Sequence, residues 1–228
     1  MFKKSAALGL AACTLFAASG AIAGSSSYIN QVQVTDGGHR IGNPDAKLAV
    51  QEFVSYTCPA CANYTRFHHG ALELAYVSTG DVTLEIRHII RDPIDLTAAM
   101  LTHCGAASKF PQNHKAMMLG QDKWLPRAQS ASAAQRSRWA TGTGASRRRA
   151  IASDMGFYAM METRGYRRTD IDRCLADEAK AAKLAEASEA NGAKYFVSST
   201  PSFAIDGVTL AGTHSWNLLE PQIRARLP

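Results

Sequence analysis

Residues 53–61, FVSYTCPAC, decide the fold of this chain. Residues 47–55 are apolar and β-prone, whereas residues 62–78 place apolar side chains at helical spacing. Cys58 and Cys61 therefore lie where a strand passes into a helix, and Pro59 suits the first helical turn, where a missing N–H group costs nothing. Two cysteines three positions apart share one face of the helix and are close enough to form a disulfide.

This position also predicts thiol chemistry. Cys58 meets the free backbone N–H groups and the positive end of the helix dipole, which favour thiolate over thiol. A thiolate is the attacking species in disulfide exchange, and Cys61, one turn deeper, can resolve the mixed disulfide. We therefore expect Cys58 to be exposed and Cys61 to be shielded. Two other interpretations of the pair are a structural zinc site, which needs two further ligands, and an inert disulfide.

The N-terminus has the pattern of a secretory signal over residues 1–23. Lys3 and Lys4 precede an apolar run that ends in Ala21-Ile22-Ala23, a small-residue cleavage site. Cleavage there removes Cys13 and leaves four of the five cysteines for an oxidising compartment, which we expect to be the periplasm. The alternative is a lipoprotein, because LAAC at 10–13 resembles a lipobox and would leave Cys13 lipidated.

The remaining composition is that of a globular protein. The 228 residues carry a formal net charge of +6, which becomes +4 without the two signal lysines. This modest basicity does not call for nucleic acid, and we interpret the basic run 147–149 as a solvated helix face.

The order of elements predicts an α/β chain. Residues 24–38 are Ser-rich and polar and are expected to form a flexible N-terminal arm. Residues 39–228 then give strand 47–55, the helix after the cysteines, strand 82–90, a helical stretch over about 94–192, a hairpin and a final helix. A Cys-x-x-Cys beside a βαβ pattern indicates a thioredoxin-like fold. The helical stretch is inserted between the βαβ half and the C-terminal ββα half.

Local signals set the expected element bounds. Asp95 is expected to cap the first helix of the insertion, Thr169 with Asp172 to open its last long helix, and Asn191-Gly192 to end it. The other expected segments of the insertion are helices at 112–120, 124–139 and 147–155. Asp206-Gly207 predicts a two-residue hairpin between strands 202–205 and 208–211, and Ser215 a cap for helix 216–227.

The sequence resembles the DsbA-like thiol–disulfide oxidoreductases of the thioredoxin superfamily. EFVSYTCPAC at 52–61 is similar to the active-site strand and helix of that family, and Gly38, GNPDA at 42–46 and STPSFAIDG at 199–207 are similar to its flanking motifs. The likeness covers most of the chain after the signal and is weakest in the helical stretch. It implies a bacterial envelope protein without a cofactor other than the redox-active cysteine pair.

The resemblance also assigns roles to single residues. It implies that Cys58 is the nucleophile, that Cys61 is its partner, and that Pro201 is a cis-proline facing them, which would leave the Thr200 backbone open to pair with an extended substrate chain. It places Glu52 below the thiols as a buried carboxyl that could carry a proton to or from Cys61. The family most often has His where this chain has Ala60, so the oxidising power is expected to be weaker.

The two remaining cysteines fall in the insertion. Cys104 and Cys174 lie in predicted helices, and in an oxidising compartment they would pair if their backbones come within bridging distance. We therefore predict a structural disulfide, with two buried free thiols as the alternative.

These observations predict an exported enzyme that donates or exchanges disulfides with folding envelope proteins. Its expected partners are reduced or misoxidised exported proteins and a membrane redox protein that recycles the cysteine pair, with no nucleic acid and no metal, and the chain is expected to be a monomer. The alternatives are a disulfide isomerase or reductase, and a thioredoxin-fold module that holds a metal through the same thiols.

Overall fold

The fold is built on a six-stranded sheet in a computed structural model that describes residues 1 and 27–227. The strand order is β1-β2-β4-β3-β5-β6, with β3 and β4 parallel and the other neighbours antiparallel. The strands are β1 Val32–Val34, β2 Gly38–Ile41, β3 Leu48–Val54, β4 Val82–His88, β5 Ser202–Ile205 and β6 Val208–Thr209. The expected α/β class and thioredoxin-like order are confirmed.

One helical stretch connects β3 to β4. It runs from Pro59 to Val77 as α1 Pro59–Tyr64, α2 Gly70–Leu72 and two π-helical segments, Thr65–His69 and Glu73–Val77. The apolar periodicity of the sequence predicts this stretch, because its buried residues, Leu72 and Val77 among them, pack on the sheet.

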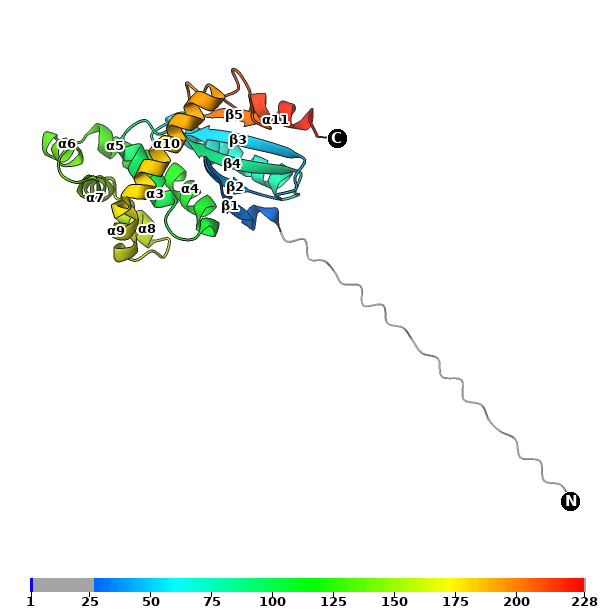
Figure 1. Cartoon of the computed structure of the whole chain (residues 1–228), viewed down its shortest axis with the longest axis horizontal. Coiled ribbons are helices and arrows are strands. Elements are labelled where there is room, and N and C mark those ends of the chain that lie inside the picture. Colours follow the sequence, from blue (N-terminus) through cyan, green and yellow to red (C-terminus); the bar gives the residue numbers. More distant parts are fainter. Residues whose placement is uncertain (2–26, 228) are drawn as a thin grey trace.

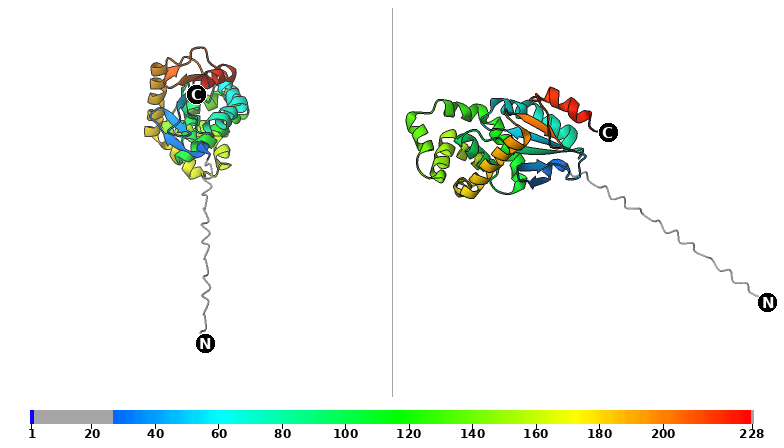
Figure 2. Two further views of the ribbon diagram at one scale, coloured as in Figure 1. Left: turned by 90° about the vertical axis from the view of Figure 1, so that its right-hand side faces the viewer. Right: turned by 45° about the horizontal axis from the view of Figure 1, so that its top comes forward.

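Eight helices follow β4 and form the insertion. They are α3 Pro93–Thr102, α4 Phe110–Leu119, α5 Gln121–Gln129, α6 Ala133–Ala140, α7 Gly144–Met155, α8 Phe157–Glu162, α9 Arg168–Ala176 and α10 Glu178–Tyr195. Short 3₁₀ helices occupy Tyr28–Asn30 and Ala107–Lys109, and α11 Trp216–Arg224 ends the fold. In Figures 1 and 2 most insertion helices lie at one end of the sheet, and α10 runs from them back to the strands.

The insertion and the sheet share one hydrophobic core. The main buried cluster contains Val50 and Leu84 from the sheet together with Trp124, Phe157 and Ile171 from the insertion. Because these side chains belong to one contiguous cluster, the insertion packs as an extension of the thioredoxin core. Among the described residues, no helix is long and apolar enough to cross a membrane.

The insertion also carries a disulfide between Cys104, just after α3, and Cys174 in α9. Their Cα atoms are 5.8 Å apart and the bridge spans 70 positions of the sequence. The bridge ties the first helix of the insertion to α9. The expected signal peptide and Cys13 lie outside the described residues.

The expectation of a flexible arm is wrong for its second half. Residues 28–30 form a helical turn and Val32–Val34 pair with β2 in the register Val32 to Ile41. The polar composition concealed this edge strand, because only Val32 is partly buried while Gln33 and Val34 are exposed. Residues 24–26 lie outside the described part of the chain.

Several predicted helix ends are also wrong. Asp92, not Asp95, caps α3, since its carboxylate accepts from the backbone N–H groups of Ile94 and Asp95. The single helix expected at 124–139 is two helices, because Ser132 forms a capping box with Gln135 and starts α6.

The last long helix begins and ends elsewhere than expected. Asp177 caps α10 by accepting from the Lys180 N–H, and Thr169 lies inside the separate helix α9. Asn191 does not end α10, because its buried amide donates to the carbonyl oxygens of Gly37 and His88 and so joins the helix to the sheet. The helix continues to Tyr195, and the insertion spans 93–195 rather than 94–192.

The C-terminal hairpin matches its prediction. Asp206 and Gly207 have φ angles of 49° and 81°, the left-handed pair that a two-residue turn requires. Strand β6 is shorter than expected, and Ser215 precedes α11 without a side-chain cap hydrogen bond.

Candidate active site

The two cysteines lie at the expected junction. Strand β3 ends at Val54, and Cys58 is the N-cap of α1 with extended backbone angles, followed by Pro59 in the first turn. The Cys58 N–H donates to the carbonyl oxygen of Ser55 at 3.2 Å, which closes the turn. This places the Cys58 sulfur beside the free N–H groups of the helix N-terminus.

Both side chains are thiols in the structure, and Cys58 is more buried than expected. Cys58 is 5% exposed and Cys61 is fully buried, so the expectation of an exposed Cys58 is wrong. Cys61 is the more shielded of the two thiols, as expected, because only Cys58 has any exposed surface. The cause is the chain around Thr200 and Pro201, which covers the sulfur from the opposite side.

Cys58 and the Thr200–Pro201 segment meet directly. The Thr200–Pro201 peptide bond is cis, and the Cys58 Sγ donates to the Thr200 carbonyl oxygen at 3.1 Å. Arg91 in turn donates from Nη2 to the Thr200 hydroxyl at 2.6 Å. The segment and the nucleophile, 142 positions apart in sequence, therefore form one site.

The surroundings drive the pKa values of the two thiols apart. The pKa of Cys58 is lowered to about 5, mainly by the hydrogen bond from the Cys61 thiol, whose effect outweighs that of burial. The Thr200 hydroxyl, the Cys61 N–H and the charge of Arg91 lower it further. The Thr200 carbonyl favours the thiol, but these donors together favour the thiolate. Burial, followed by the hydrogen bond to Cys58, raises the pKa of Cys61 far above its usual range. The pair thus holds one thiolate and one thiol at neutral pH.

The insertion holds the loop that carries Cys58. Gln121 at the start of α5 donates from Nε2 to the carbonyl oxygens of Tyr56 at 2.6 Å and Cys58 at 3.0 Å. Asp95 in α3 accepts from the Ser55 hydroxyl at 2.5 Å and from the Tyr56 N–H at 2.8 Å. Burial raises the pKa of Asp95 to about 6, although these donors oppose the rise. Three residues of the loop are therefore fixed by helices outside the thioredoxin sheet.

Glu52 is buried on β3, not solvent-facing. Its side chain is fully buried, and neither carboxylate oxygen has a hydrogen-bond partner among the described residues. The nearest charge partner is His69, whose Nδ1 lies 3.4 Å from Oε2 of Glu52. A buried carboxylate needs such a compensating charge, because transfer from water disfavours the ionised form.

His69 connects Glu52 to the surface. Its Nε2 lies 3.2 Å from Oε1 of Glu73, and Oε2 of Glu73 accepts from Nζ of Lys115 at 2.9 Å. Burial alone would lower the pKa of His69, but the carboxylates of Glu52 and Glu73 raise it to about 9. Burial would raise the pKa of Glu73, but His69 and Lys115 lower it to about 2. Glu52, His69, Glu73 and Lys115 thus form a row of alternating charge that leads from the core to the half-exposed Lys115.

The comparisons with known proteins agree with this geometry. Residues 34–225 match the model of a family described as thioredoxin. The chain belongs to the thioredoxin family. A crystal structure described as a protein-disulfide isomerase from Novosphingobium aromaticivorans is 48% identical, with a TM-score of 0.81, over 85% of this chain and 98% of that one.

More distant proteins are also similar to this chain. The α-DsbA1 of Wolbachia pipientis superposes with a TM-score of 0.67 at 18% identity, over 86% of this chain and 94% of that chain. A Rickettsia conorii protein named as a protein-disulfide oxidoreductase is 34% identical over 93 residues, which are 40% of this chain. The alignment spans 34% of that relative, so the chain matches about a third of its length. The DsbA-like resemblance is confirmed at the level of the fold.

In this thioredoxin-family chain the predicted site residues separate into two groups. Cys58, Cys61, Thr200 and Pro201 meet at one end of the sheet, with Glu52 buried on the strand that leads to them, whereas the Cys104–Cys174 bridge lies within the insertion. Among the described residues no group of three or more His, Cys, Asp or Glu side chains could hold a metal.

The structure also brings in residues that the sequence did not indicate. Arg91, Gln121 and His69 carry no spacing signal, since each reaches the site through a contact between distant segments. The expected role of Asp95 is wrong, because its carboxylate holds the active loop instead of capping a helix. The only local signal at Asp95 is its position two residues after Pro93, in the first turn of α3, which does not indicate a contact with the Cys58 loop.

Proposed function

We propose that this chain is an exported thiol–disulfide oxidoreductase that donates or exchanges disulfides with folding envelope proteins through Cys58-Pro59-Ala60-Cys61. One observation carries the proposal: a thiol with a pKa of about 5 lies at a helix N-terminus, beside a second buried thiol whose pKa is raised. A difference in pKa between the two thiols is typical of a pair that exchanges disulfides, because one thiol must attack or leave as a thiolate. It is not expected of an inert pair.

In the oxidising direction the cycle starts from the Cys58–Cys61 disulfide. A substrate thiolate attacks Sγ of Cys58, the S–S bond breaks, and Cys61 leaves as a thiolate that takes up a proton. A second substrate thiolate then attacks the substrate sulfur of the mixed disulfide and expels Cys58. Two electrons pass from the two substrate thiols to the enzyme, which ends as a Cys58 thiolate and a Cys61 thiol. A low pKa makes Cys58 a good leaving group in the last step.

Glu52 is the proposed proton donor and acceptor for Cys61. Cys61 must gain a proton on leaving and lose it when the disulfide is restored, yet it is fully buried. Glu52 is a buried ionisable group on the strand that leads to the thiols, and its partner His69 supplies a charge that compensates the carboxylate. We propose that an extended substrate chain lies against Thr200 and Pro201 and pairs with the backbone of Thr200.

A second direction of the same chemistry also has support. The relative that is 48% identical is described as a protein-disulfide isomerase. In isomerisation the Cys58 thiolate would attack a wrong substrate disulfide, and a different substrate thiolate would later expel it, without net oxidation. The low pKa of Cys58 serves both directions, and the redox potential of the couple decides between them.

Export and recycling complete the proposal. The signal pattern at residues 1–23 supports a mature chain that starts near Gly24 in the periplasm. There an oxidase needs a partner that removes its two electrons after each turnover, and we infer a membrane redox protein in that role.

A two-substrate assay tests the proposed function. Oxidised protein is mixed with a reduced protein substrate, and reduced protein with a scrambled-disulfide substrate, and the disulfides formed are counted by mass spectrometry. An oxidase converts the first substrate with loss of its own disulfide, whereas an isomerase repairs the second. Cys58→Ser should abolish both reactions. If the unmodified protein performs neither reaction, the proposal is overturned.

A further inference from the structure

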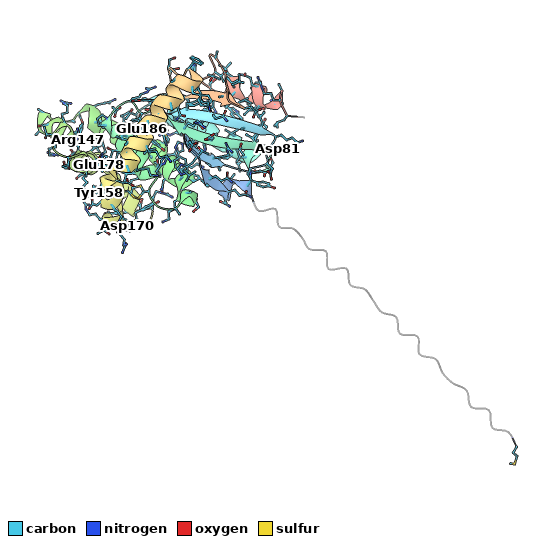
Figure 3. The ribbon with its side chains drawn as sticks, in the orientation of Figure 1. Asp81, Arg147, Tyr158, Asp170, Glu178 and Glu186 are labelled. Atoms are coloured by element: carbon cyan, nitrogen blue, oxygen red, sulfur yellow. A yellow bond between two sulfur atoms is a disulfide. The ribbon has the colours of Figure 1, made fainter. Side chains whose placement is uncertain are left out.

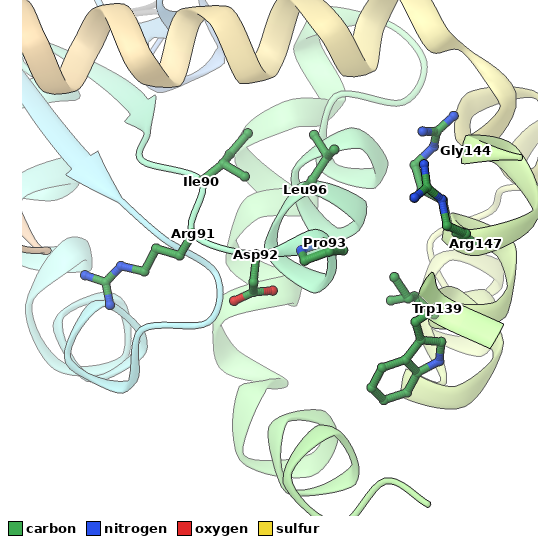
Figure 4. Close-up of a pocket in the computed structure, with 10 residues that line it drawn as sticks. Ile90, Arg91, Asp92, Pro93, Leu96, Trp139, Gly144 and Arg147 are labelled. Carbon is green, nitrogen blue, oxygen red and sulfur yellow. The ribbon is translucent and has the colours of Figure 1, made fainter. Parts of the chain in front are cut away.

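A pocket lies beside the active site, between the thioredoxin sheet and the insertion. Its volume is about 310 Å³, and it opens between the segment that links β4 to α3 and the helices α6 and α7. Figure 4 shows Ile90, Pro93 and Leu96 on one side, and Trp139 and Arg147 across from them. Its size is at the lower end of ligand pockets and suits one or two side chains.

Two contacts connect the pocket to the nucleophile. Arg91, which lines it, donates to the hydroxyl of Thr200, whose carbonyl oxygen accepts from Cys58. Asp92, the next lining residue, accepts from the hydroxyl of Thr57 at 2.9 Å. A polypeptide that is joined to Cys58 and lies against Thr200 would therefore pass the mouth of this pocket.

The walls of the pocket are apolar. Leu96 and Ile90 are partly buried and Ile151 is fully buried below them. Trp139 presents its ring from α6, with its Nε1 held by Asp154 at 2.7 Å. An apolar side chain placed here would lose water contact on several sides, which favours its binding.

Some of the charged groups that line the pocket already have hydrogen-bond or ion-pair partners. Both carboxylate oxygens of Asp92 already accept hydrogen bonds. Arg148 is buried and donates to the Leu175 carbonyl oxygen and to Glu178, at 2.7 and 2.6 Å. Arg147 also acts on Glu178 by its charge, but at a longer range.

Arg91 and Arg147 carry the remaining positive charge. Across residues 27–227 neither of them forms an ion pair within 4.0 Å, and both are exposed. Figure 3 shows Arg147 within the insertion, in the same region as Glu178. An apolar pocket with cationic groups at its edge is complementary to an apolar residue next to a carboxylate.

We propose that this pocket recognises a segment of the substrate protein in which an apolar residue adjoins Asp or Glu near the reactive cysteine. The inference rests on the proposed function and adds a substrate class to it. The apolar side chain packs against Leu96, Ile151 and Trp139, and the acidic side chain pairs with Arg147. Basic segments are disfavoured, since they would place like charges together.

Two matched peptides test the inference. Each has two cysteines and the same sequence except that Asp-Leu in one is Lys-Leu in the other. Oxidised protein reacts with each peptide in a single turnover, in which the peptide dithiol becomes a disulfide and the Cys58–Cys61 disulfide becomes a dithiol. We expect the acidic peptide to react about tenfold faster at low salt, and the ratio to fall as salt screens the charges.

Variants locate the preference. Arg147→Glu should bring the ratio of the two rate constants to about one or below, and Arg147→Gln should give an intermediate ratio. Lys123→Glu makes the same charge change at an exposed site of α5 that does not line the pocket, and should leave the ratio unchanged. A ratio near one in the unmodified protein, or a ratio that Arg147→Glu does not move, overturns the recognition and leaves the proposed function intact. If neither peptide is oxidised, the oxidising direction of the proposed function fails, and the inference fails with it.

Discussion

Gln121 donates a hydrogen bond to the carbonyl oxygen of Cys58 at 3.0 Å, so a helix of the insertion holds the backbone of the nucleophile. The same amide nitrogen donates to Tyr56 at 2.6 Å, and the Gln121 side chain is buried. A helix of the insertion therefore contributes directly to the geometry of the candidate active site.

Replacing this amide should weaken both stability and reactivity. Gln121→Ala leaves the buried Tyr56 carbonyl oxygen without its donor, and the Cys58 carbonyl oxygen with only the Ala62 N–H at 3.3 Å. The loss should lower the free energy of unfolding by about 1–3 kcal/mol. Urea denaturation of the oxidised form measures this, and the rate of alkylation of Cys58 reports on the loop. The control is Gln129→Ala at an exposed site of the same helix, where we expect a change within about 0.5 kcal/mol. Equal effects of the two variants would contradict the role of Gln121.

The ionisation of Cys58 should control the pH dependence of the redox potential. With a pKa of about 5 for Cys58 and a raised pKa for Cys61, reduction above pH 5 takes up two electrons and one proton. The potential should then fall by about 30 mV per pH unit, and by about twice that below pH 5, where two protons are taken up. Equilibration with glutathione between pH 4 and pH 8 measures the slope. A slope of about 60 mV per unit throughout would show that Cys58 is not ionised.

The same ionisation makes the reduced form more stable at higher pH. Because the folded-state pKa of Cys58 is below its ordinary value of 9.0, the stabilisation is complete above pH 9 and is lost as the pH falls through 5. The oxidised form has no thiolate, and so the difference in stability between the two forms should grow from pH 5 to pH 9. Urea denaturation of both forms across this range measures the difference, and a constant difference would contradict the low pKa.

Ala60 should give the Cys58–Cys61 couple a lower redox potential than histidine would give at this position. The side chain is exposed beside the Cys58 thiolate, so an imidazole there would add a cationic or hydrogen-bonding partner. Ala60→His should raise the redox potential of the couple by about 30 mV for each tenfold gain in thiolate stability. Ala60→Gln is the control for size, and a potential that does not rise in the histidine variant contradicts the prediction.

The buried His69 should contribute stability of opposite pH dependence. Its pKa is raised from 6.5 to about 9, so its stabilisation is complete below pH 6.5 and is lost as the pH rises through 9. Unfolding of the oxidised protein at pH 6 and pH 10 should show this loss, on the order of 2 kcal/mol, and His69→Gln should remove most of it. His68→Gln, next to it and only partly buried, is the control. If His68→Gln changes the pH profile as much as His69→Gln, the row from Glu52 to Lys115 is not its cause.

The Cys104–Cys174 bridge should be a structural element. Thiol counting on the denatured mature chain, which starts near Gly24 and lacks Cys13, should find no free thiols when its active pair is oxidised. Replacing both cysteines by alanine should lower the free energy of unfolding by about 4 kcal/mol in the chain-entropy model for a loop of this length, and should leave the redox potential of Cys58–Cys61 unchanged. Two free thiols in the unmodified protein would rule the bridge out.

Local chemistry explains what the sequence could predict. The strand, the Cys-x-x-Cys pair and Pro59 are consecutive, and the turn at Asp206-Gly207 depends on two residues that tolerate positive φ. Such features need no knowledge of distant contacts, so the fold class and the reactive pair follow from the sequence. The predicted ends of α3 and α10 are wrong because competing signals, such as Asp92 and Asp95, stand close together in the chain.

The supporting residues could not be predicted because their partners are far away in the sequence. Asn191 followed by Gly192 is typical of a helix end, but the Asn191 amide donates to the carbonyl oxygens of Gly37, just before β2, and of His88 in β4. Nothing near Gln121 or His69 indicates that one reaches the Cys58 loop and the other Glu52. Their roles exist only after the insertion has packed on the sheet.

The contact between Cys58 and Thr200 also has a consequence for the growing chain. An emerging polypeptide displays Cys58 and Cys61 long before it contains Thr200, which follows 142 positions later. Until β5 has joined β3, the thiols lack the wall that shields them and the partner that helps to set their acidity. Reactivity is thereby coupled to completion of the polypeptide, and a prematurely terminated product would contain both cysteines without the assembled site.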